Sequence, residues 1–521
     1  MPDRIRQDMG RRSVHEMEVT HPNGLPVVRR LLQAFDREGI RYCHWKSNIH
    51  LLEGMIGLTD LDVLFDRVGT DRLDRIMGEA GYKRFLAAPT RWHPGMEDYL
   101  GFDEGTGSLV HFHTHHSLRM GEKHAKGYWL PWEELFLATR VVQQPEGMYA
   151  CHPDVEMVIF LVRAALKSRL RDIYFELLGR RYTRGDMAAE YAWLRERADL
   201  THVVALIDEL LGPAAARVGR DILGGPVTLR GLMRLRRAGN PVLKRCRNHN
   251  APMARLRRWY LEGYGILTAI RRRYFSPTRP TKRTVPSGGA IIAFVGSDGS
   301  GKSTAVKAVR HWLSWKVDVL SIYHGSGEGP TSLLRWPLRF LLRLLPAEGG
   351  RGSASEAARG EASPRRRSRL RRLARRLRPV WALVLALEKR DKLKRSWRAR
   401  NRGMVVVCDR YPQNQVEGFN DGPLLRHWSH SRWALLRALA RWEGAPYVWA
   451  EKLPPDLVIK MIVSPQVARA RKPDMDIAEL RRRDATIRSL SFPRSRVVEI
   501  NGDAPLDDVM LEVKRSVWRV L

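Results

Sequence analysis

Five apolar runs in the C-terminal part of the chain alternate with segments of helical spacing. The runs are continuous rather than alternating in polarity, which is typical of strands buried on both faces. A parallel sheet covered by helices on both sides buries its strands in this way. The pattern therefore predicts an α/β domain over residues 290–521 with a five-stranded parallel sheet, its strands being residues 291–295, 317–323, 404–408, 457–463 and 497–500.

The N-terminal part of the chain mixes helical and strand patterns over shorter distances. Helical spacing of apolar residues occurs at 25–38 and 72–80, and short apolar runs at 61–65 and 109–113 indicate strands. We therefore expect a compact α/β domain over residues 24–150.

The middle of the chain has few strand signals and many arginines. Its clearest helical segments are residues 157–170, 187–194 and 201–211, so residues 151–275 are expected to form a helical connector. Residues 276–289 are rich in Pro, Thr, Lys and Gly, a composition that is typical of a linker.

A long basic insertion, residues 324–403, interrupts the C-terminal pattern. Nine arginines lie between positions 365 and 378, after a stretch rich in Gly, Ala, Ser and Glu. One interpretation is a solvated or disordered insertion. The other takes residues 333–345 and 370–387 as basic amphipathic helices that lie on an anionic membrane or polymer surface.

Composition bounds the partners and the compartment. The 521 residues carry a formal charge of +35, which favours anionic partners, but the arginines are spread along the whole chain and do not favour specific nucleic-acid binding. The four cysteines lack paired or metal-ligand spacing, residues 1–20 lack the apolar core of a signal peptide, and no apolar run is long enough to cross a membrane. We expect a cytoplasmic protein, with peripheral membrane association left open.

The strongest candidate chemistry is a glycine-rich loop between the strand at 291–295 and a helical pattern at 305–315. Its glycines let successive backbone N–H groups turn toward a polyphosphate at the positive end of the helix. Lys302 is expected to reach the outer phosphates of ATP, and the Ser303 hydroxyl to ligate Mg²⁺. A chance glycine-rich turn is the alternative. The predicted ATP-binding residues of this loop are Gly296, Ser297, Asp298, Gly299, Ser300, Gly301, Lys302, Ser303 and Thr304.

A second polar group follows the apolar run at 404–408. Asp409 and Arg410 stand at the carboxyl edge of the expected sheet, where ligands of open α/β sheets bind. Asp409 can hold Mg²⁺ through water or orient an attacking phosphate, and Arg410 can neutralise phosphate charge. With Lys302 they form the predicted catalytic group. The alternative is an Asp-Arg pair that only caps a strand.

These motifs resemble those of the thymidylate kinase family of P-loop nucleoside monophosphate kinases. The resemblance covers residues 290–521 and rests on residues 296–304, 409–411, 455–457, 467–473 and 500–503. It implies a lid whose Arg469 and Arg471 close over ATP, with Mg²⁺ as the second cofactor. It also implies that Arg390 and Tyr411 bind a phosphorylated acceptor.

The acceptor side departs from that family. Pro-Gln-Asn-Gln at 412–415 replaces its Ser and Ala-Tyr-Gln segment, and Tyr-His-Gly-Ser-Gly at 323–327 replaces an acidic turn. The resemblance therefore implies ATP-dependent phosphoryl transfer to a nucleoside monophosphate or another phosphorylated small molecule, more strongly than to thymidylate.

The N-terminal domain carries a further candidate site. Asp60 and Asp62 alternate on one strand and share a face, as carboxylates do that hold divalent ions for nucleotidyl transfer. With Ser47 thirteen residues before Asp60, the segment resembles the nucleotidyltransferase superfamily, although His111 stands where that family has a third carboxylate. His111 and His113 share a strand face too, so a histidine metal site stays open. The domain is either an active nucleotidyltransferase or an inactive fold kept for binding.

Two functions compete for the whole chain. One is a thymidylate-kinase-like phosphotransferase fused behind the nucleotidyltransferase-like domain, favoured by the Asp409-Arg410 pair that follows an intact loop. The other is a nucleotide-gated binding protein that docks on an anionic surface, favoured by the arginine-rich insertion.

Overall fold

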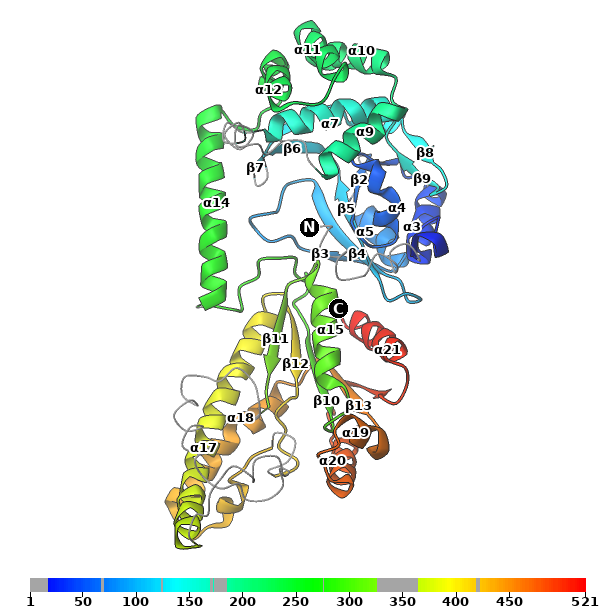
Figure 1. The fold of residues 1–521 in the computed structure, drawn as a ribbon. Helices are drawn as coiled ribbons and strands as arrows, with labels where there is room; N and C mark the ends of the chain where they lie inside the picture. The colour runs from blue at the N-terminus through cyan, green and yellow to red at the C-terminus, as the bar shows by residue number, and fades with distance from the viewer. Residues whose placement is uncertain are drawn as a thin grey trace. The chain divides into compact units, whose positions relative to one another are not determined.

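The chain forms two compact units in a computed structural model, Met1–Ile270 and Arg271–Leu521 (Figure 1). The structure describes residues 17–66, 70–122, 125–168, 172, 185–274, 276–325, 364–417 and 422–521. Both units are α/β, as the hydrophobic pattern predicts.

A mixed seven-stranded sheet lies at the centre of the first unit, in the order β3-β4-β5-β2-β1-β9-β8. The central strands β2 and β5 are parallel, with Asp60 opposite His111 and Asp62 opposite His113. β4 pairs antiparallel with the other edge of β5. The strands are β1 (Tyr42–His44), β2 (Asp60–Phe65), β3 (Tyr82–Phe85), β4 (Met96–Phe102), β5 (Leu109–His115), β8 (Val141–Gln143) and β9 (Met148–Ala150), and a separate hairpin is formed by β6 (Leu118–Glu122) and β7 (Ala125–Leu130).

Helices near the start of the chain pack on one face of this sheet. Apolar residues of α3, among them Leu31 and Phe35, join a core with Leu61 and Val63 of β2. The predicted helices at 25–38 and 72–80 correspond to α3 and α5. The helices here are α3 (Pro26–Arg37), η1 (Asn48–His50), α4 (Leu51–Met55) and α5 (Thr70–Glu79), whereas α6 (Glu133–Ala138) packs into a second core through Phe136 and Leu137.

The helical middle of the chain shares a second core with the same sheet. Cys43 of β1 and Leu64 of β2 belong to one apolar cluster with Phe160 of α7 and Leu206 of α10. These helices are α7 (Pro153–Lys167), α9 (Asp186–Arg197), α10 (Leu200–Leu211), α11 (Pro213–Leu223), α12 (Leu229–Ala238), α13 (Asn240–Arg245) and α14 (Ala251–Tyr274).

The second unit is built on a five-stranded sheet in which every pair of neighbours is parallel, in the order β11-β12-β10-β13-β14. All five strands that the apolar runs predict are present. They are β10 (Ile291–Gly296), β11 (Val319–Tyr323), β12 (Val405–Asp409), β13 (Leu457–Ile462) and β14 (Arg496–Asn501). β10 and β12 are buried along their length and β13 is buried up to its last residue, whereas β14 lies at the sheet edge and is mostly exposed.

Helices cover both faces of this sheet. Alternate residues of β10, Ile291, Ala293 and Val295, pack with Leu393 of α17 and Ile487 of α20. On the other face α15 contacts β10, β11 and β12 and packs against α21. The helices are α15 (Lys302–Ser314), α17 (Pro364–Arg400), η3 (Arg426–His430), α18 (Ala434–Lys452), α19 (Pro465–Arg471), α20 (Ile477–Ser489) and α21 (Leu506–Trp518).

The basic insertion contributes part of that cover. Residues 364–400 form the single helix α17, whose C-terminal half buries Ala382, Leu393 and Ala399. The predicted amphipathic segment 370–387 lies within this helix, and the segment 333–345 lies outside the described residues.

No helix in the described ranges combines the length and apolar character that crossing a membrane requires. All four cysteines are free thiols, and three of them are buried.

Candidate functional site

The glycine-rich loop leaves the carboxyl end of the central strand β10 and leads into α15. Gly299 and Gly301 have φ angles of +81° and +85°, which side-chain-bearing residues rarely adopt. A Cβ on Gly299 would lie 2.8 Å from the carbonyl oxygen of Ala468, and one on Gly296 would lie 2.7 Å from that of Met461. The tight turn therefore depends on glycine at positions 296 and 299.

Lys302 is the first residue of α15, and its side chain folds back over the loop. Its Nζ donates a hydrogen bond to the Ser297 carbonyl oxygen at 2.6 Å. Ser300 lies beneath, and its Oγ is buried with no hydrogen-bond partner among the described residues. Thr304, the third residue of α15, is exposed. The loop thus gathers an ammonium, a hydroxyl and a helix N-terminus, which together favour an anion.

Asp409 ends β12, the strand next to β10, so the sheet brings it to the loop. It pairs in register with Phe294, two residues before Gly296. The Ser303 hydroxyl donates to its Oδ2 at 2.8 Å. A carboxylate and a hydroxyl joined in this way are oxygen ligands of the kind that Mg²⁺ prefers, and ions of this kind are usually shared with substrate phosphates.

Asp298 in the loop collects arginines from two distant parts of the chain. Arg410, whose backbone is left-handed with φ +69°, lies 3.4 Å from its Oδ1, and Arg483 of α20 pairs with its Oδ2. Burial acts to raise the pKa of Asp298, but the charges of Lys302, Arg410 and Arg483 outweigh it and lower that pKa below its ordinary value. Arg483 belongs to none of the motifs found in the sequence, so its contact with the loop could not be predicted from residue spacing.

The two predicted lid arginines lie on α19. Arg471 donates to the carbonyl oxygen of Gly299 at 3.3 Å and to that of Gly502 at 2.9 Å, so it closes one side of the loop. Arg469 is exposed on the same short helix.

The two predicted acceptor residues line different grooves. Arg390 is exposed beside Trp442 in a groove of about 340 Å³ between α17 and α18. Tyr411 is buried, donates its hydroxyl to the Leu453 carbonyl oxygen at 2.5 Å, and borders a second groove of about 430 Å³ that also contains Gln413.

His324 is a further polar residue at this edge of the sheet. It follows β11, its backbone N–H donates to the Asp409 carbonyl oxygen at 3.0 Å, and its ring packs on Tyr411 with 5.6 Å between centroids. The ring is fully buried, and neither nitrogen has a partner in the part of the chain that the structure describes. Burial, and then the charges of Lys389 and Lys392, lower the pKa of His324 well below its usual value.

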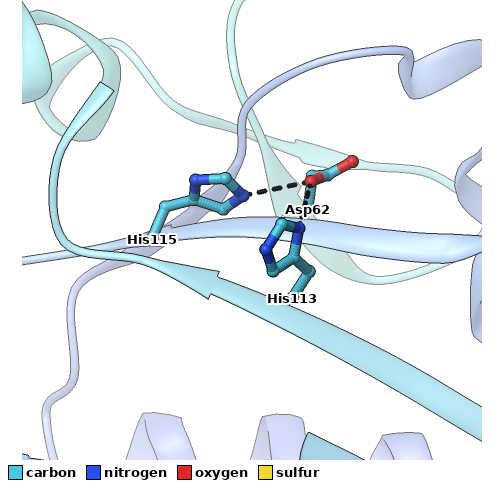
Figure 2. Close-up of side chains that lie close together, drawn as sticks. All are labelled: Asp62, His113 and His115. Atoms are coloured by element: carbon cyan, nitrogen blue, oxygen red, sulfur yellow. Dashed lines mark hydrogen bonds and ion pairs between the residues drawn. The ribbon is translucent and has the colours of Figure 1, made fainter. Parts of the chain in front are cut away.

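A second polar cluster lies in the first unit, where β2 and β5 run side by side (Figure 2). Asp62 Oδ1 is 3.0 Å from His113 Nδ1, 3.0 Å from His115 Nε2 and 2.9 Å from Lys46 Nζ. Burial lowers the pKa of both histidines, and that of His115 falls well below its usual value. Burial acts to raise the pKa of Asp62, but Lys46 and the two histidines hold it well below its ordinary value.

Asp60 has different partners, although it shares the strand face of Asp62. His111 is fully buried between two carboxylates, with Nδ1 2.8 Å from Asp60 Oδ1 and Nε2 2.8 Å from Asp98 Oδ1. Asp98 comes from β4 and was not among the residues predicted for this site. The structure therefore places three carboxylates around the histidines of β5.

Ser47 adopts a left-handed backbone with φ +57°. Its hydroxyl donates to Glu190 of α9 at 3.0 Å and accepts from Arg163 of α7 at 3.3 Å. The turn that carries Ser47 is thus tied to the helical middle of the chain, beside the Lys46–Asp62 pair.

Comparison with known proteins finds relatives but no matching family model. The chain is 30% identical over 236 residues to the uncharacterized ATP-binding protein YghS of Escherichia coli K12, a match covering 44% of this chain and 93% of YghS. It is 27% identical over 251 residues to YghR of the same strain, also described as an uncharacterized ATP-binding protein, covering 46% of this chain and 91% of YghR. Over the matched segment the chain belongs to the same family as YghS.

Proposed function

We propose that this protein binds ATP at the glycine-rich loop and transfers its terminal phosphate to a phosphorylated small molecule. The observation that carries the proposal is the contact between Ser303 and Asp409, 2.8 Å apart beside the buried Lys302. A phosphoryl transfer enzyme needs positioned positive charge and a held Mg²⁺ more than it needs covalent chemistry. Lys302 would supply the charge, and the Ser303–Asp409 pair would hold the ion.

ATP is the nucleotide we propose because YghS and YghR are both named as ATP-binding proteins and match this chain over nearly their whole length. When bound, Mg²⁺ would neutralise charge on the transferring phosphate. Arg410 and Lys302 both act on Asp298, and Arg471 contacts the loop at the carbonyl oxygen of Gly299. These guanidiniums suit a polyphosphate because their planar forks match phosphate oxygens.

Cationic side chains of α17 favour a phosphorylated acceptor. Lys389, Arg390 and Lys392 lie within about one turn of α17, and the charges of the two lysines act on the buried His324. An anionic acceptor would offset the repulsion among these groups. The neutral His324 could accept or donate one hydrogen bond to it, because neutral imidazole carries one donor and one acceptor.

The direct test measures radiolabelled phosphate transfer from ATP to a panel of nucleoside monophosphates and sugar phosphates. One acceptor is expected to yield a labelled product at a rate well above ATP hydrolysis alone. The label should also require Mg²⁺. A panel in which no acceptor is labelled and none stimulates ATP turnover would contradict the phosphotransferase proposal.

Docking on an anionic lipid surface is a second candidate function, favoured by α14. The helix carries six arginines and one acidic residue, and its large apolar residues are exposed rather than packed. Helical spacing puts them along one face: Met253, Leu256, Tyr260, Tyr264, Leu267 and Tyr274, with Trp259 beside them. An exposed apolar stripe edged by arginines is the pattern of helices that lie in an anionic lipid interface.

The double variant Trp259→Ser/Leu267→Ser tests this surface. The full-length protein is expected to sediment with phosphatidylglycerol vesicles more than with phosphatidylcholine vesicles, and the variant should lose most of that difference, because apolar area and anionic charge act together in such binding. Trp433→Ser/Leu435→Ser is the matched control, since those side chains are 61% and 71% exposed, against 65% and 62% for Trp259 and Leu267. An equal loss of vesicle binding in both double variants would contradict lipid docking by α14. The proposal would also fail if the wild-type protein self-associated and only the α14 variant abolished this, because the exposed face would then be a contact between copies of the chain.

A further inference from the structure

We propose that Asp62, His113 and His115 of the first unit bind a divalent first-row transition metal ion such as Zn²⁺. The three side chains come from the adjacent parallel strands β2 and β5, and Figure 2 shows both imidazoles pointing at one carboxylate. One ligand atom from each residue lies within 4.8 Å of the others. This site belongs to a different unit from the phosphate-binding loop and does not depend on the proposed phosphate transfer.

Hydrogen bonding alone does not explain the arrangement of side chains around Asp62. His113, His115 and Lys46 all approach the same atom, Oδ1, at 2.9 to 3.0 Å. A carboxylate oxygen has two lone-pair positions, so three donors exceed what it accepts well. A metal ion among the two imidazole nitrogens and the carboxylate would use the same atoms as ligands and remove that crowding.

The donor set selects the class of metal. Two imidazole nitrogens and one carboxylate oxygen suit Zn²⁺, Fe²⁺ or Co²⁺, whereas Mg²⁺ prefers oxygen ligands alone. Three protein ligands leave at least one position on the ion for water or a ligand. Asp62 and His113 are partly exposed, so an ion can reach them from solvent. His115 is buried, so packing holds its imidazole in place.

The surroundings carry several cations. Lys46 contacts Asp62 directly, and the charges of both act on Lys126, whose pKa burial lowers to about 7. Arg163, which contacts Ser47, is paired with Glu190 at 3.0 Å. Lys46 is thus a cation in direct contact with the cluster, and it would favour an anionic ligand at the open position of the ion. Asp60 takes no part, because it pairs with His111 instead.

The test uses the full-length protein, stripped with a chelator and dialysed against Zn²⁺ or Co²⁺ without nucleotide, followed by elemental analysis. The wild-type protein is expected to bind one equivalent of metal per chain. The variants Asp62→Asn, His113→Gln and His115→Gln should each lose this metal. Each change should weaken binding more than about 100-fold, since even groups that only orient a ligand contribute about 10- to 100-fold. His202→Gln, a surface histidine of the same unit, should keep full binding.

X-ray absorption of the zinc-loaded wild-type protein tests the same claim without any variant. Two imidazoles with nitrogen and oxygen at about 2.0–2.2 Å are expected. An all-oxygen shell, no bound metal in the wild type, or full binding by all three cluster variants would each overturn the proposal. Lys302→Ala should leave metal binding unchanged, so loss of phosphate transfer and loss of this site can be told apart.

Discussion

Lys302→Ala is expected to abolish ATP-dependent phosphate transfer. The ammonium lies inside the loop, bound to the Ser297 carbonyl oxygen, where it would meet the charge that develops on the transferring phosphate. Removing one such group typically slows a reaction by about 100- to 1,000-fold. Transfer of label from ATP in purified protein, at saturating ATP, is the measurement.

The fold is expected to survive this change, because Lys302 belongs to the loop edge and not to the apolar core of α15, which is formed by Ala305, Val309 and Leu313. Lys307→Ala is the matched control, since Lys307 is exposed on the same helix. Both variants should melt close to the wild type. Wild-type turnover in Lys302→Ala would remove the basis for a kinase.

The C-terminal sheet could be predicted from the sequence because its three inner strands, β10, β12 and β13, are buried on both faces. Continuous apolar runs such as those of β10 and β12 stand out against the polar segments beside them. Only part of the N-terminal sheet could be predicted from the sequence. β1, β8 and β9 are three residues long, and β4 contains two consecutive acidic residues and a glycine, without the alternation of a half-buried strand or the apolar run of a buried one. Neither length nor pattern therefore distinguishes these strands from loops.

The candidate sites divide in the same way. The loop glycines and Lys302 are contiguous, so their spacing alone indicates their role, and Asp409 joins them because β12 neighbours β10. Arg483 and His324 reach the site through tertiary packing that no local pattern encodes.

In the first unit, period two put Asp60 and Asp62 on one face, but their partners depend on the register of β2 against β5. That register gives Asp60 the contact with His111 and Asp62 the contacts with His113 and His115, and the pairing of β4 with β5 brings Asp98 to His111. Sequence spacing cannot supply a register between strands separated by about fifty residues, because it is set by the packing of the whole sheet.

Asp409→Asn is expected to slow phosphate transfer at least about 100-fold while ATP affinity changes only a few-fold. The amide keeps the shape of the carboxyl and can still accept the hydrogen bond from Ser303, but it removes the negative charge that would hold Mg²⁺. The loop backbone and Lys302 still provide phosphate contacts. Turnover and ATP dissociation constants, measured on the same preparation, separate the two effects.

Ser303→Ala sharpens this prediction. If Ser303 and Asp409 act through one ion, the double variant should be little slower than Asp409→Asn alone, since groups that work as a unit are not additive. If the fold-losses in rate of the two single variants multiply in the double variant, the two side chains act separately. Parallel losses of turnover and ATP affinity in Asp409→Asn would assign the carboxylate to binding or structure, and the shared Mg²⁺ would have to be given up.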